Sequence, residues 1–360
     1  MASAHHGVSQ CHLPLPFSQL SLPVPFSQLS LPVPGRPRYP STILAMTTEP
    51  VHPAHLVRAP AKVNLTLEVL GRRPDGFHAL RSVFAALNIY DRLEVFPAAA
   101  LEIECNVPEL ATSANLAWRA ADALRHDAGV RAGARLVLEK RIPLEAGLGG
   151  GSANAAAALV GANALWNLQY SKERLREIGA MIGSDVPFFL GDGPLALVTG
   201  RGEVLRSLPV PPALREGRIV LLKPPVGISA GAVYRAFPPA RWGGDADRSG
   251  PWMHAALAAA TVSDMPEPFN DLESVALEVA PDAAVARDAL IAAGAPHAVM
   301  SGSGSTFLAH LDPSRAAHVA KRLRAMPTTA GWFIAVAGLG TLPHCVECNP
   351  RESEREFILP

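Results

Sequence analysis

The sequence predicts an α+β fold divided into two domains. Its 360 residues are enough to bury two hydrophobic cores. Stretches that alternate like strands and stretches with helical spacing mix on both sides of a proline-rich seam at Pro209–Pro212. We therefore expect one domain over residues 51–210, a second over residues 211–340, and a tail over residues 341–360.

The elements expected before the seam follow from apolar periodicity. Val63–Leu70 alternates apolar and polar residues like a half-buried strand, and Gly71–Gly76 supplies the turn after it. Asn115–Arg125 has helical spacing, with Ser113 as the expected N-cap. We also expect strands at residues 92–96 and 135–139, and helices at residues 152–166 and 175–182.

The elements expected after the seam follow the same rules. A strand at Arg218–Leu222 leads through Lys223 and two prolines into a helix at Ala230–Phe237. Arg241–Gly250 is polar and glycine-rich, which predicts a loop. The remaining predictions are helices at residues 270–279, 285–293 and 316–324, and strands at residues 298–300, 306–310 and 333–337.

Residues 1–50 differ from the rest in composition. Leu13–Ser21 is repeated almost unchanged as Leu22–Ser30, and both copies are rich in proline. Proline fixes φ and lacks an N–H donor, so we expect a disordered leader here. It is either a targeting segment or sequence that precedes a translation start at Met46.

Charge and cysteine content limit the partners. Lys plus Arg equals Asp plus Glu, at 32 each, which favours neither a nucleic-acid partner nor a membrane surface. The one C-x-x-C pair, Cys345 and Cys348, lacks two further zinc ligands, with only His344 nearby. We expect reduced thiols, a cytoplasmic location, no membrane span, and a monomer or weak homodimer acting on a small molecule.

The most informative stretch is Pro143–Asn154, which places four glycines in the five positions 147–151 ahead of an alanine-rich helix. Glycines expose backbone N–H groups, and a helix N-terminus attracts anions, so the pattern predicts a phosphate site. A Walker A loop would need a lysine after the glycines, and a dinucleotide fingerprint would need a glycine at Ser152. The alternative is a turn whose glycines only permit tight packing.

Three further segments accompany this loop: Ala59–Asn64 (A-P-A-K-V-N), Gly183–Phe189 (G-S-D-V-P-F-F) and Ser301–Thr306 (S-G-S-G-S-T). Together and in this order they resemble the GHMP kinase superfamily, over about Val57–Gly340. The R-P-D-G-F-H segment at residues 73–78 looks like the branch that phosphorylates the 2-hydroxyl of a cytidine diphosphate-linked methylerythritol. The resemblance implies an N-terminal domain with a left-handed β-α-β unit, a ferredoxin-like C-terminal domain, and catalysis between them.

The resemblance also implies the catalytic pair, Lys62 and Asp185. The aspartate would accept the proton of the attacking hydroxyl, and the lysine would keep it ionised and stabilise the forming alkoxide. Whether the aspartate is a full base or only orients the hydroxyl stays open. The alternatives are a helix cap or an arginine partner for Asp185, and a solvated strand residue for Lys62.

ATP and Mg²⁺ are the implied cofactors, with no metal ligand assigned. Ser152 is expected to cap the helix. Glu145 and Ala146 occupy positions often filled by Gly or Ala in the resembled family, and Glu145 would either bend outward or weaken ATP binding. Asn115 and Lys140 match positions that border the adenosine, or are a helix cap and a strand-end charge. The full predicted ATP site is Pro143, Leu144, Glu145, Ala146, Gly147, Leu148, Gly149, Gly150, Gly151, Ser152, Ala153, Asn115 and Lys140.

The predicted acceptor site gathers residues from both domains. Phe77 and Tyr234 would sandwich the cytosine while His78 bonds its polar edge, unless the two rings are ordinary core. Asn64 would bind the methylerythritol, with Asn270 and Asp271 lining the same pocket, and Ser301, Gly302, Ser303 and Gly304 would form a closing loop or a plain turn. The rival functions are another kinase of the superfamily, acting on homoserine or mevalonate, and a catalytically silent nucleotide-binding regulator.

Overall fold

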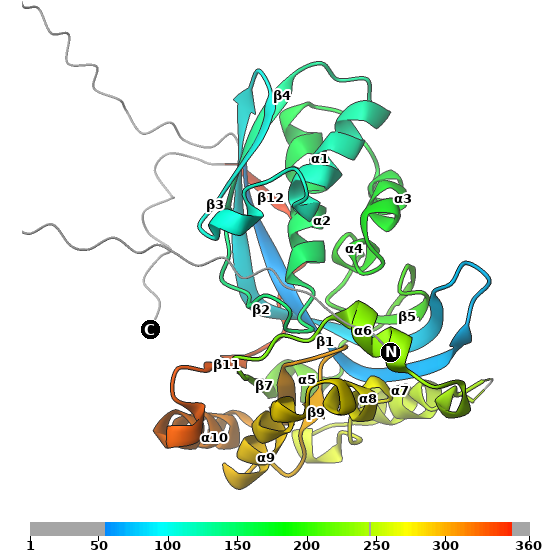
Figure 1. The fold of residues 1–360 in the computed structure, drawn as a ribbon, viewed down its shortest axis with the longest axis vertical. Helices are drawn as coiled ribbons and strands as arrows, with labels where there is room; N and C mark the ends of the chain where they lie inside the picture. Colours follow the sequence, from blue (N-terminus) through cyan, green and yellow to red (C-terminus); the bar gives the residue numbers. More distant parts are fainter. Residues whose placement is uncertain (1–54, 245, 348–360) are drawn as a thin grey trace, which may run out of the picture. The chain divides into compact units, whose positions relative to one another are not determined.

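The computed structural model describes residues 55–244 and 246–347, with the backbone alone for the last three. The predicted leader and the end of the tail, with Cys348, lie outside the described residues. Among the described helices, none has the length and apolar character that a bilayer crossing requires. The described chain is a mixture of helices and strands, as the predicted α+β class requires (Figure 1).

A large mixed sheet organises the first part of the chain. Its central strands run in the order β12-β1-β2-β4-β3. In addition, β5 pairs with β2, β6 pairs with β5, and β8 pairs with β1. The strands are β1 (His55–Arg72), β2 (His78–Ala98), β3 (Leu101–Cys105), β4 (Gly133–Glu139), β5 (Leu195–Gly200), β6 (Val204–Ser207), β8 (Phe269–Asn270) and β12 (Cys345–Glu347). The tail therefore contributes an edge strand, because β12 pairs with the start of β1.

The long antiparallel pair β1–β2 carries several predicted site residues. Its register shifts between Pro60 and Ala61 and again between Asn64 and Thr66. Such bulges re-aim side chains locally, and these two flank Lys62 and Asn64. The strand predicted at residues 63–70 is thus the middle of a longer strand, buried on both faces around the site.

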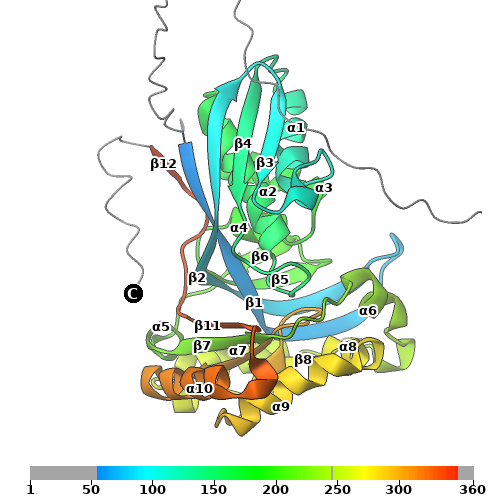
Figure 2. The same cartoon turned by 60° about the vertical axis from the view of Figure 1, so that its left-hand side comes forward.

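Four helices cover one face of this sheet (Figures 1 and 2). They are α1 (Leu116–Asp127), α2 (Gly150–Leu165), α3 (Lys172–Ile182) and α4 (Val186–Phe189). The α2 helix packs closely because its alanines are buried, and a Cβ added at Gly161 would lie 2.7 Å from Val95 Cγ2. Parallel strands β3 and β4 flank α1, which forms a β-α-β unit; its left hand stays a prediction.

A second, antiparallel sheet has the order β11-β7-β10-β9. Its strands are β7 (Arg218–Lys223), β9 (Val299–Met300), β10 (Phe307–Leu311) and β11 (Phe333–Ala337). With helices between the first and second strands and between the third and fourth, this is the ferredoxin-like β-α-β-β-α-β arrangement that we predicted. The accompanying helices are α5 (Pro212–Glu216), α6 (Ala230–Ala236), α7 (Ser249–Ala258), α8 (Leu272–Val279), α9 (Ala284–Ala292) and α10 (Pro313–Ala325).

Short 3-10 turns lie at Pro108–Leu110, Pro239–Arg241, Val262–Asp264, Pro281–Ala283 and Pro327–Thr329.

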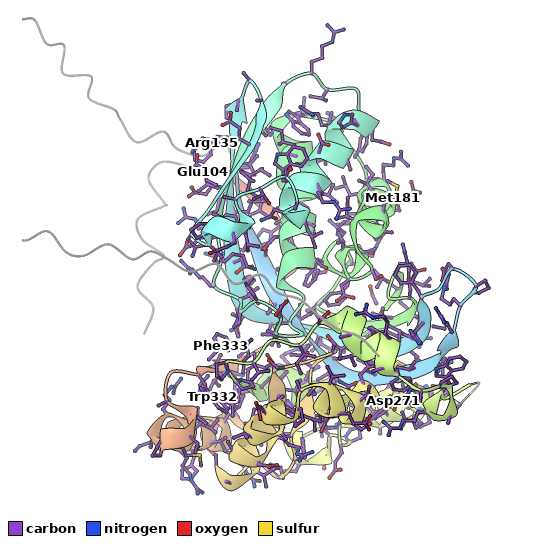
Figure 3. The ribbon with its side chains drawn as sticks, viewed as in Figure 1. Glu104, Arg135, Met181, Asp271, Trp332 and Phe333 are labelled. Atoms are coloured by element: carbon purple, nitrogen blue, oxygen red, sulfur yellow. The ribbon has the colours of Figure 1, made fainter. Side chains whose placement is uncertain are left out.

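An ion pair links the neighbouring strands β3 and β4 at the surface. Figure 3 labels Glu104 on β3 and Arg135 on β4, whose Oε1 and Nη1 atoms lie 3.2 Å apart. In the same view Met181 extends from α3, and its side chain is exposed.

Three local predictions are wrong. The N-cap of α1 is Asn115 rather than Ser113, because the Asn115 side chain accepts a hydrogen bond from Ala117 N–H at 2.9 Å. The predicted loop at residues 241–250 begins on the last residue of a 3-10 turn and ends within the first residues of α7. Asn270 is not helical but ends β8, which pairs in parallel with β1.

Candidate active site

A cavity of about 1290 Å³ lies where β1, the glycine loop, α6 and the Ser301–Thr306 loop meet. Most of the predicted site residues line it, although they come from segments far apart in the chain. Predicted residues in its lining are Lys62, Asn64, Phe77, His78, Lys140, Pro143, Leu144, Glu145, Ala146, Gly147, Leu148, Gly149, Gly150, Gly151, Ser152, Asp185, Tyr234, Gly302, Ser303 and Gly304. Those outside the lining are Asn115, Ala153, Asn270, Asp271 and Ser301.

The predicted catalytic pair converges in this cavity. Lys62 Nζ lies 3.5 Å from Asp185 Oδ2, with the lysine buried and the aspartate partly open to the cavity. Asp185 occupies the N-cap position of α4, but its side chain makes no capping hydrogen bond within the described structure. Its carboxylate therefore faces the lysine and the cavity rather than the helix, which disfavours the cap alternative.

The Lys62 ammonium is held from three sides. Its Nζ donates to Asn64 Oδ1 at 2.7 Å and lies 4.6 Å from the centroid of the Phe84 ring. Asn64 Nδ2 in turn donates to Ser82 Oγ at 2.8 Å, which fixes the amide with its oxygen toward the lysine. Asn64 is almost fully buried, so in this structure it positions the lysine, and its predicted contact with the methylerythritol stays a prediction.

The glycine loop has the conformation that only glycine adopts easily. Gly147 and Gly149 have φ values of 72° and 69°, in the left-handed region. A Cβ at Gly149 would lie 2.8 Å from Lys62 Cγ, so the missing side chain lets the loop approach the catalytic lysine. Gly149 is also the N-cap of α2 and brings no side chain to cap it. The first N–H groups of α2 therefore face the cavity edge as an anion site.

The structure corrects one prediction about the glycine loop, on Ser152, and shows the direction of the Glu145 side chain. Ser152 does not cap α2, because the helix already begins at Gly150; it lies in the first turn instead. Glu145, which has a φ of 48°, directs its side chain against Gly227 of the second domain. Burial lowers the pKa of Lys223, and the Glu145 charge opposes that shift, so the two side chains are electrostatic neighbours.

The Ser301–Thr306 loop closes against the glycine loop. Ser301 Oγ donates to Gly147 O at 3.0 Å, and Thr306 N–H donates to Ala146 O at 3.3 Å. Gly302 has a φ of 58°, and a Cβ added there would lie 3.5 Å from Lys62 Nζ. The Ser301–Thr306 loop thus covers the lysine. Ser301 itself does not line the cavity; its side chain holds this loop against the glycine loop.

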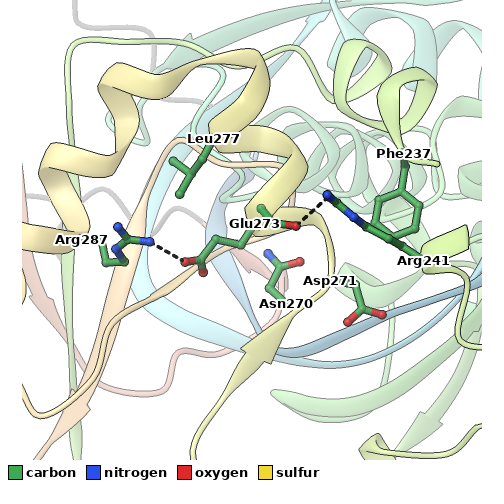
Figure 4. Close-up of a pocket in the computed structure, with 8 residues that line it drawn as sticks. Phe237, Arg241, Asn270, Asp271, Glu273, Leu277 and Arg287 are labelled. Carbon is green, nitrogen blue, oxygen red and sulfur yellow. Dashed lines mark hydrogen bonds and ion pairs between the residues drawn. The ribbon is translucent and has the colours of Figure 1, made fainter.

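The prediction that Asn270 and Asp271 line the acceptor pocket is wrong, because neither residue lines the 1290 Å³ cavity. They line a separate cavity of about 430 Å³, shown in Figure 4. Asn270 Nδ2 donates to Met300 O at 2.8 Å and to Gly302 O at 2.7 Å, so it holds the closing loop from behind. Asp271 accepts from Val69 N–H at 3.0 Å and pairs with Arg248.

The aromatic residues are arranged differently from the predicted sandwich. His78 stacks on Tyr234, with centroids 5.4 Å apart and planes 25° from parallel, while Phe77 is half exposed beside Arg201. Burial, and then the Arg72 charge, lowers the pKa of His78, which keeps the imidazole neutral with one donor and one acceptor nitrogen. Burial first, and then the Asp185 charge, raises the pKa of Tyr234.

Sequence reasoning missed several residues of the cavity. Arg72, Arg201 and Arg235 line it and bring positive charge to the aromatic end. Ser82 lies beneath Asn64, as described above. No short motif contains these residues; only the pairing of β2 with β1 on one side and with β5 on the other brings the first two arginines to one end of the sheet.

Asn115 and Lys140 both show the structural roles that we had kept as alternatives. The Asn115 amide is engaged as the α1 cap and by a hydrogen bond to Leu110 O at 2.8 Å. The Lys140 ammonium is buried between Asp91 and Asn154. Their predicted contacts with adenosine stay predictions.

Metal ligands are sparse in the described residues, which contain no cluster of three or more His, Cys, Asp or Glu side chains. Mg²⁺ in kinases is held by one or two carboxylates together with substrate phosphates and water. Asp185 beside the glycine loop fits that requirement.

Known proteins share this architecture. A family model described as the GHMP kinases N terminal domain matches residues 115–193, and one described as GHMP kinases C terminal matches residues 249–328. A homoserine kinase from Cytophaga hutchinsonii, 18% identical with a TM-score of 0.62 over 83% of this chain and 99% of its own, shares the fold. The chain belongs to the GHMP kinase family.

Three similar proteins with 36–45% identity are named as one kind of kinase. A 4-diphosphocytidyl-2-C-methyl-D-erythritol kinase from Pelotomaculum thermopropionicum is 45% identical over 74% of this chain and 92% of its own. One from Carboxydothermus hydrogenoformans is 41% identical over 71% and 87%. A solved structure of 4-(cytidine 5'-diphospho)-2C-methyl-D-erythritol kinase is 36% identical, with a TM-score of 0.64 over 79% of this chain and 100% of its own.

Proposed function

We propose that this protein is an ATP-dependent kinase that phosphorylates the 2-hydroxyl of 4-(cytidine 5'-diphospho)-2-C-methyl-D-erythritol, in the non-mevalonate route to isoprenoid precursors. The observation that carries the proposal is the convergence of Lys62 and Asp185, 3.5 Å apart, beside the uncapped start of α2. The names of the similar proteins support the choice of acceptor.

Asp185 accepts the proton of the 2-hydroxyl as its oxygen attacks the γ-phosphorus. The bond from that phosphorus to the β–γ bridging oxygen breaks, and ADP leaves. Lys62, fixed by Asn64, keeps Asp185 ionised and stabilises negative charge on the attacking oxygen. Most of the rate acceleration then comes from alignment, because the Ser301–Thr306 loop and the glycine loop hold the two reactants together.

Backbone N–H groups of Gly147–Ser152 hold the triphosphate at the helix N-terminus. When bound, Mg²⁺ would be held mainly by the triphosphate and water, with Asp185 as a carboxylate that could add to its ligands, and it would neutralise phosphate charge. The outward turn of Glu145 supports this arrangement, because its charge lies against Gly227 and not along the loop's glycines.

The acceptor binds at the aromatic end of the cavity. Its cytosine packs against the His78–Tyr234 stack, and Phe77 closes over it from the exposed rim. A single small-molecule site typically has about 300–1,000 Å³. The cavity here measures about 1290 Å³, which supports room for a nucleotide and an acceptor together.

The proposal is tested by coupled ADP release with Mg²⁺-ATP and one acceptor at a time. Turnover should be high with the cytidine diphosphate-linked methylerythritol and at least about a hundredfold lower with free methylerythritol, homoserine or mevalonate, since a lost cytidine anchor costs several kcal/mol. Preference for homoserine or mevalonate would assign the chain to another kinase of the family. ATP binding without turnover on any acceptor would favour the silent regulator.

The predicted domain bounds at residues 50, 210 and 340, the cytoplasmic location and the monomer or weak homodimer remain part of this proposal. Size-exclusion chromatography with light scattering checks the oligomeric state, and limited proteolysis checks the bounds.

A further inference from the structure

Asp91 is a fully buried carboxylate on β2 that the proposed reaction does not use. Its Oδ1 accepts hydrogen bonds from Arg141 N–H at 2.7 Å and Ile142 N–H at 2.8 Å. Its Oδ2 accepts one from Asn154 Nδ2 at 2.8 Å and pairs with Lys140 Nζ. Removing a charge from water is costly, so a carboxylate this deeply buried needs such a full set of partners.

The partners of Asp91 lie on both sides of the glycine loop. Arg141 and Ile142 come directly before Pro143, where the loop begins, and Asn154 is in the second turn of α2, where the loop has ended. One carboxylate therefore fixes the entry and the exit of the segment that presents N–H groups to the phosphates. Asn106 tightens the entry, because its Oδ1 accepts from Lys140 N–H at 2.7 Å and its Nδ2 donates to Lys140 O at 3.1 Å.

Asp91 also sets the place of a buried positive charge. Lys140 Nζ donates to Asn154 Oδ1 at 3.0 Å in addition to its pairing with Asp91. A Cβ added at Gly150 would lie 3.0 Å from that Nζ, so the ammonium sits directly beneath the first residue of α2. Lys140 is in the cavity lining, so the ammonium that Asp91 holds lies at the positive end of the helix dipole.

We propose that Asp91 is a positioning residue for the triphosphate: it fixes both ends of the glycine loop and holds the Lys140 ammonium under the N-terminus of α2. The inference rests on the proposed function, since it presumes that ATP phosphates bind this loop. It assigns Lys140 to the phosphates, where the sequence had suggested the adenosine. A residue that only supports the fold would affect every ligand alike, whereas a phosphate-positioning residue affects ligands according to their phosphates.

The test compares Mg²⁺-ATP with adenosine on purified full-length protein. ATP affinity is measured by titration calorimetry and adenosine affinity by NMR titration, for the wild type and for Asp91→Asn. We expect Asp91→Asn to weaken ATP binding by about tenfold or more and to change adenosine binding by no more than about twofold. Equal loss for both ligands, or unchanged ATP affinity, would overturn the proposal.

A second variant guards against misfolding, because Asp91→Asn leaves Lys140 buried without its counter-charge. The double variant Asp91→Asn/Lys140→Met removes both charges and should fold, as checked by circular dichroism, yet retain the ATP-selective loss. Wild-type ATP affinity in the double variant would contradict the proposal. Glu139→Gln is the matched control, since Glu139 ends β4 next to Lys140 and its side chain pairs only with Arg141 Nε and Nη2 in the described structure. This variant should bind ATP as the wild type does.

The two levels of the account fail separately. A wild-type protein that does not bind Mg²⁺-ATP would remove the proposed function itself. A wild type that binds ATP and phosphorylates its acceptor, with an Asp91→Asn variant that binds ATP equally well, would remove only the role of Asp91.

Discussion

The imidazole of His78 and the phenol ring of Tyr234 lie nearly parallel, with their centroids 5.4 Å apart. His78 begins β2 and Tyr234 lies in α6, so the stack is formed by two elements that are far apart in the sequence. It lies at the end of the cavity that also holds Arg72, Arg201 and Arg235. Phe237 and Trp242 meet the same imidazole edge-on, at 6.5 and 6.4 Å. An aromatic slot of this kind suits a planar base with polar edges.

His78→Ala should therefore lose acceptor discrimination. We expect the ratio of kcat/KM for the cytidine diphosphate-linked methylerythritol over free methylerythritol to fall by at least about tenfold, which corresponds to roughly 1.4 kcal/mol. The KM for ATP should stay the same. Steady-state kinetics with both acceptors checks this, with His126→Ala as the control, because the His126 side chain is exposed near the end of α1. An unchanged ratio would remove His78 from cytidine recognition.

Asn270→Ala should loosen the closing loop. The variant loses the two hydrogen bonds that Asn270 Nδ2 donates to Met300 O and Gly302 O. Both carbonyls belong to the chain that forms the start of the Ser301–Thr306 loop or directly precedes it. We expect kcat to fall about tenfold and the Kd of ATP to change by less than about threefold, since each lost buried hydrogen bond costs about 1 kcal/mol.

Ser274→Ala is the control for this variant, because Ser274 lines the same second cavity but its hydroxyl accepts a hydrogen bond from Arg241 instead. It should keep wild-type kcat. Equal kcat in Asn270→Ala and the wild type would show that the closing loop needs no support from Asn270.

His310 should make the second domain acid-sensitive. Burial, with a smaller effect of nearby His297, lowers the pKa of His310 to about 4, against about 6.5 in an unfolded chain. Between these values the unfolded state binds more protons than the folded state, so the free energy of unfolding falls as the pH falls from 6.5 toward 4. The expected loss between pH 7 and pH 5 is about 2 kcal/mol.

Urea unfolding at the two pH values measures this loss. His310→Phe removes the titrating group from a site where the ring already packs on Gly217, so its pH dependence should be smaller by that amount. The same replacement at exposed His318 should leave the pH dependence as in the wild type. Equal pH dependence in the His310 variant and the wild type would refute the assignment.

Much of the fold could be predicted because its signals are local. The alternation at Val63–Leu70 and the alanine run after Gly151 each identify an element without reference to the rest of the chain. The α1 cap was assigned to the wrong residue because Ser113 and Asn115 are both good capping types, and only the backbone decides between them. The start of α7 was missed because Gly250 and Pro251 suggest a loop, although proline is well tolerated in a first helical turn.

The candidate site could be predicted where motifs carry it and not elsewhere. Lys62, Asp185 and the glycine loop lie in recognisable segments, and the structure brings them together. Asp91 and Ser82 have no motif; their importance arises only when strand pairing and helix packing bury them beside the loop. Asn270 was placed in the wrong cavity because its sequence position gives no sign of which face of the Ser301–Thr306 loop it supports.

The account's central claim is that Asp185, beside Lys62, acts on the acceptor hydroxyl in the phosphoryl-transfer step. Single-turnover phosphoryl transfer by Asp185→Asn, measured with saturating Mg²⁺-ATP and acceptor alongside an exposed Asp192→Asn control, tests it most directly. We predict a rate about 10²–10⁴-fold below the wild type, with the Kd of ATP within about threefold. A rate near that of the wild type would contradict the account.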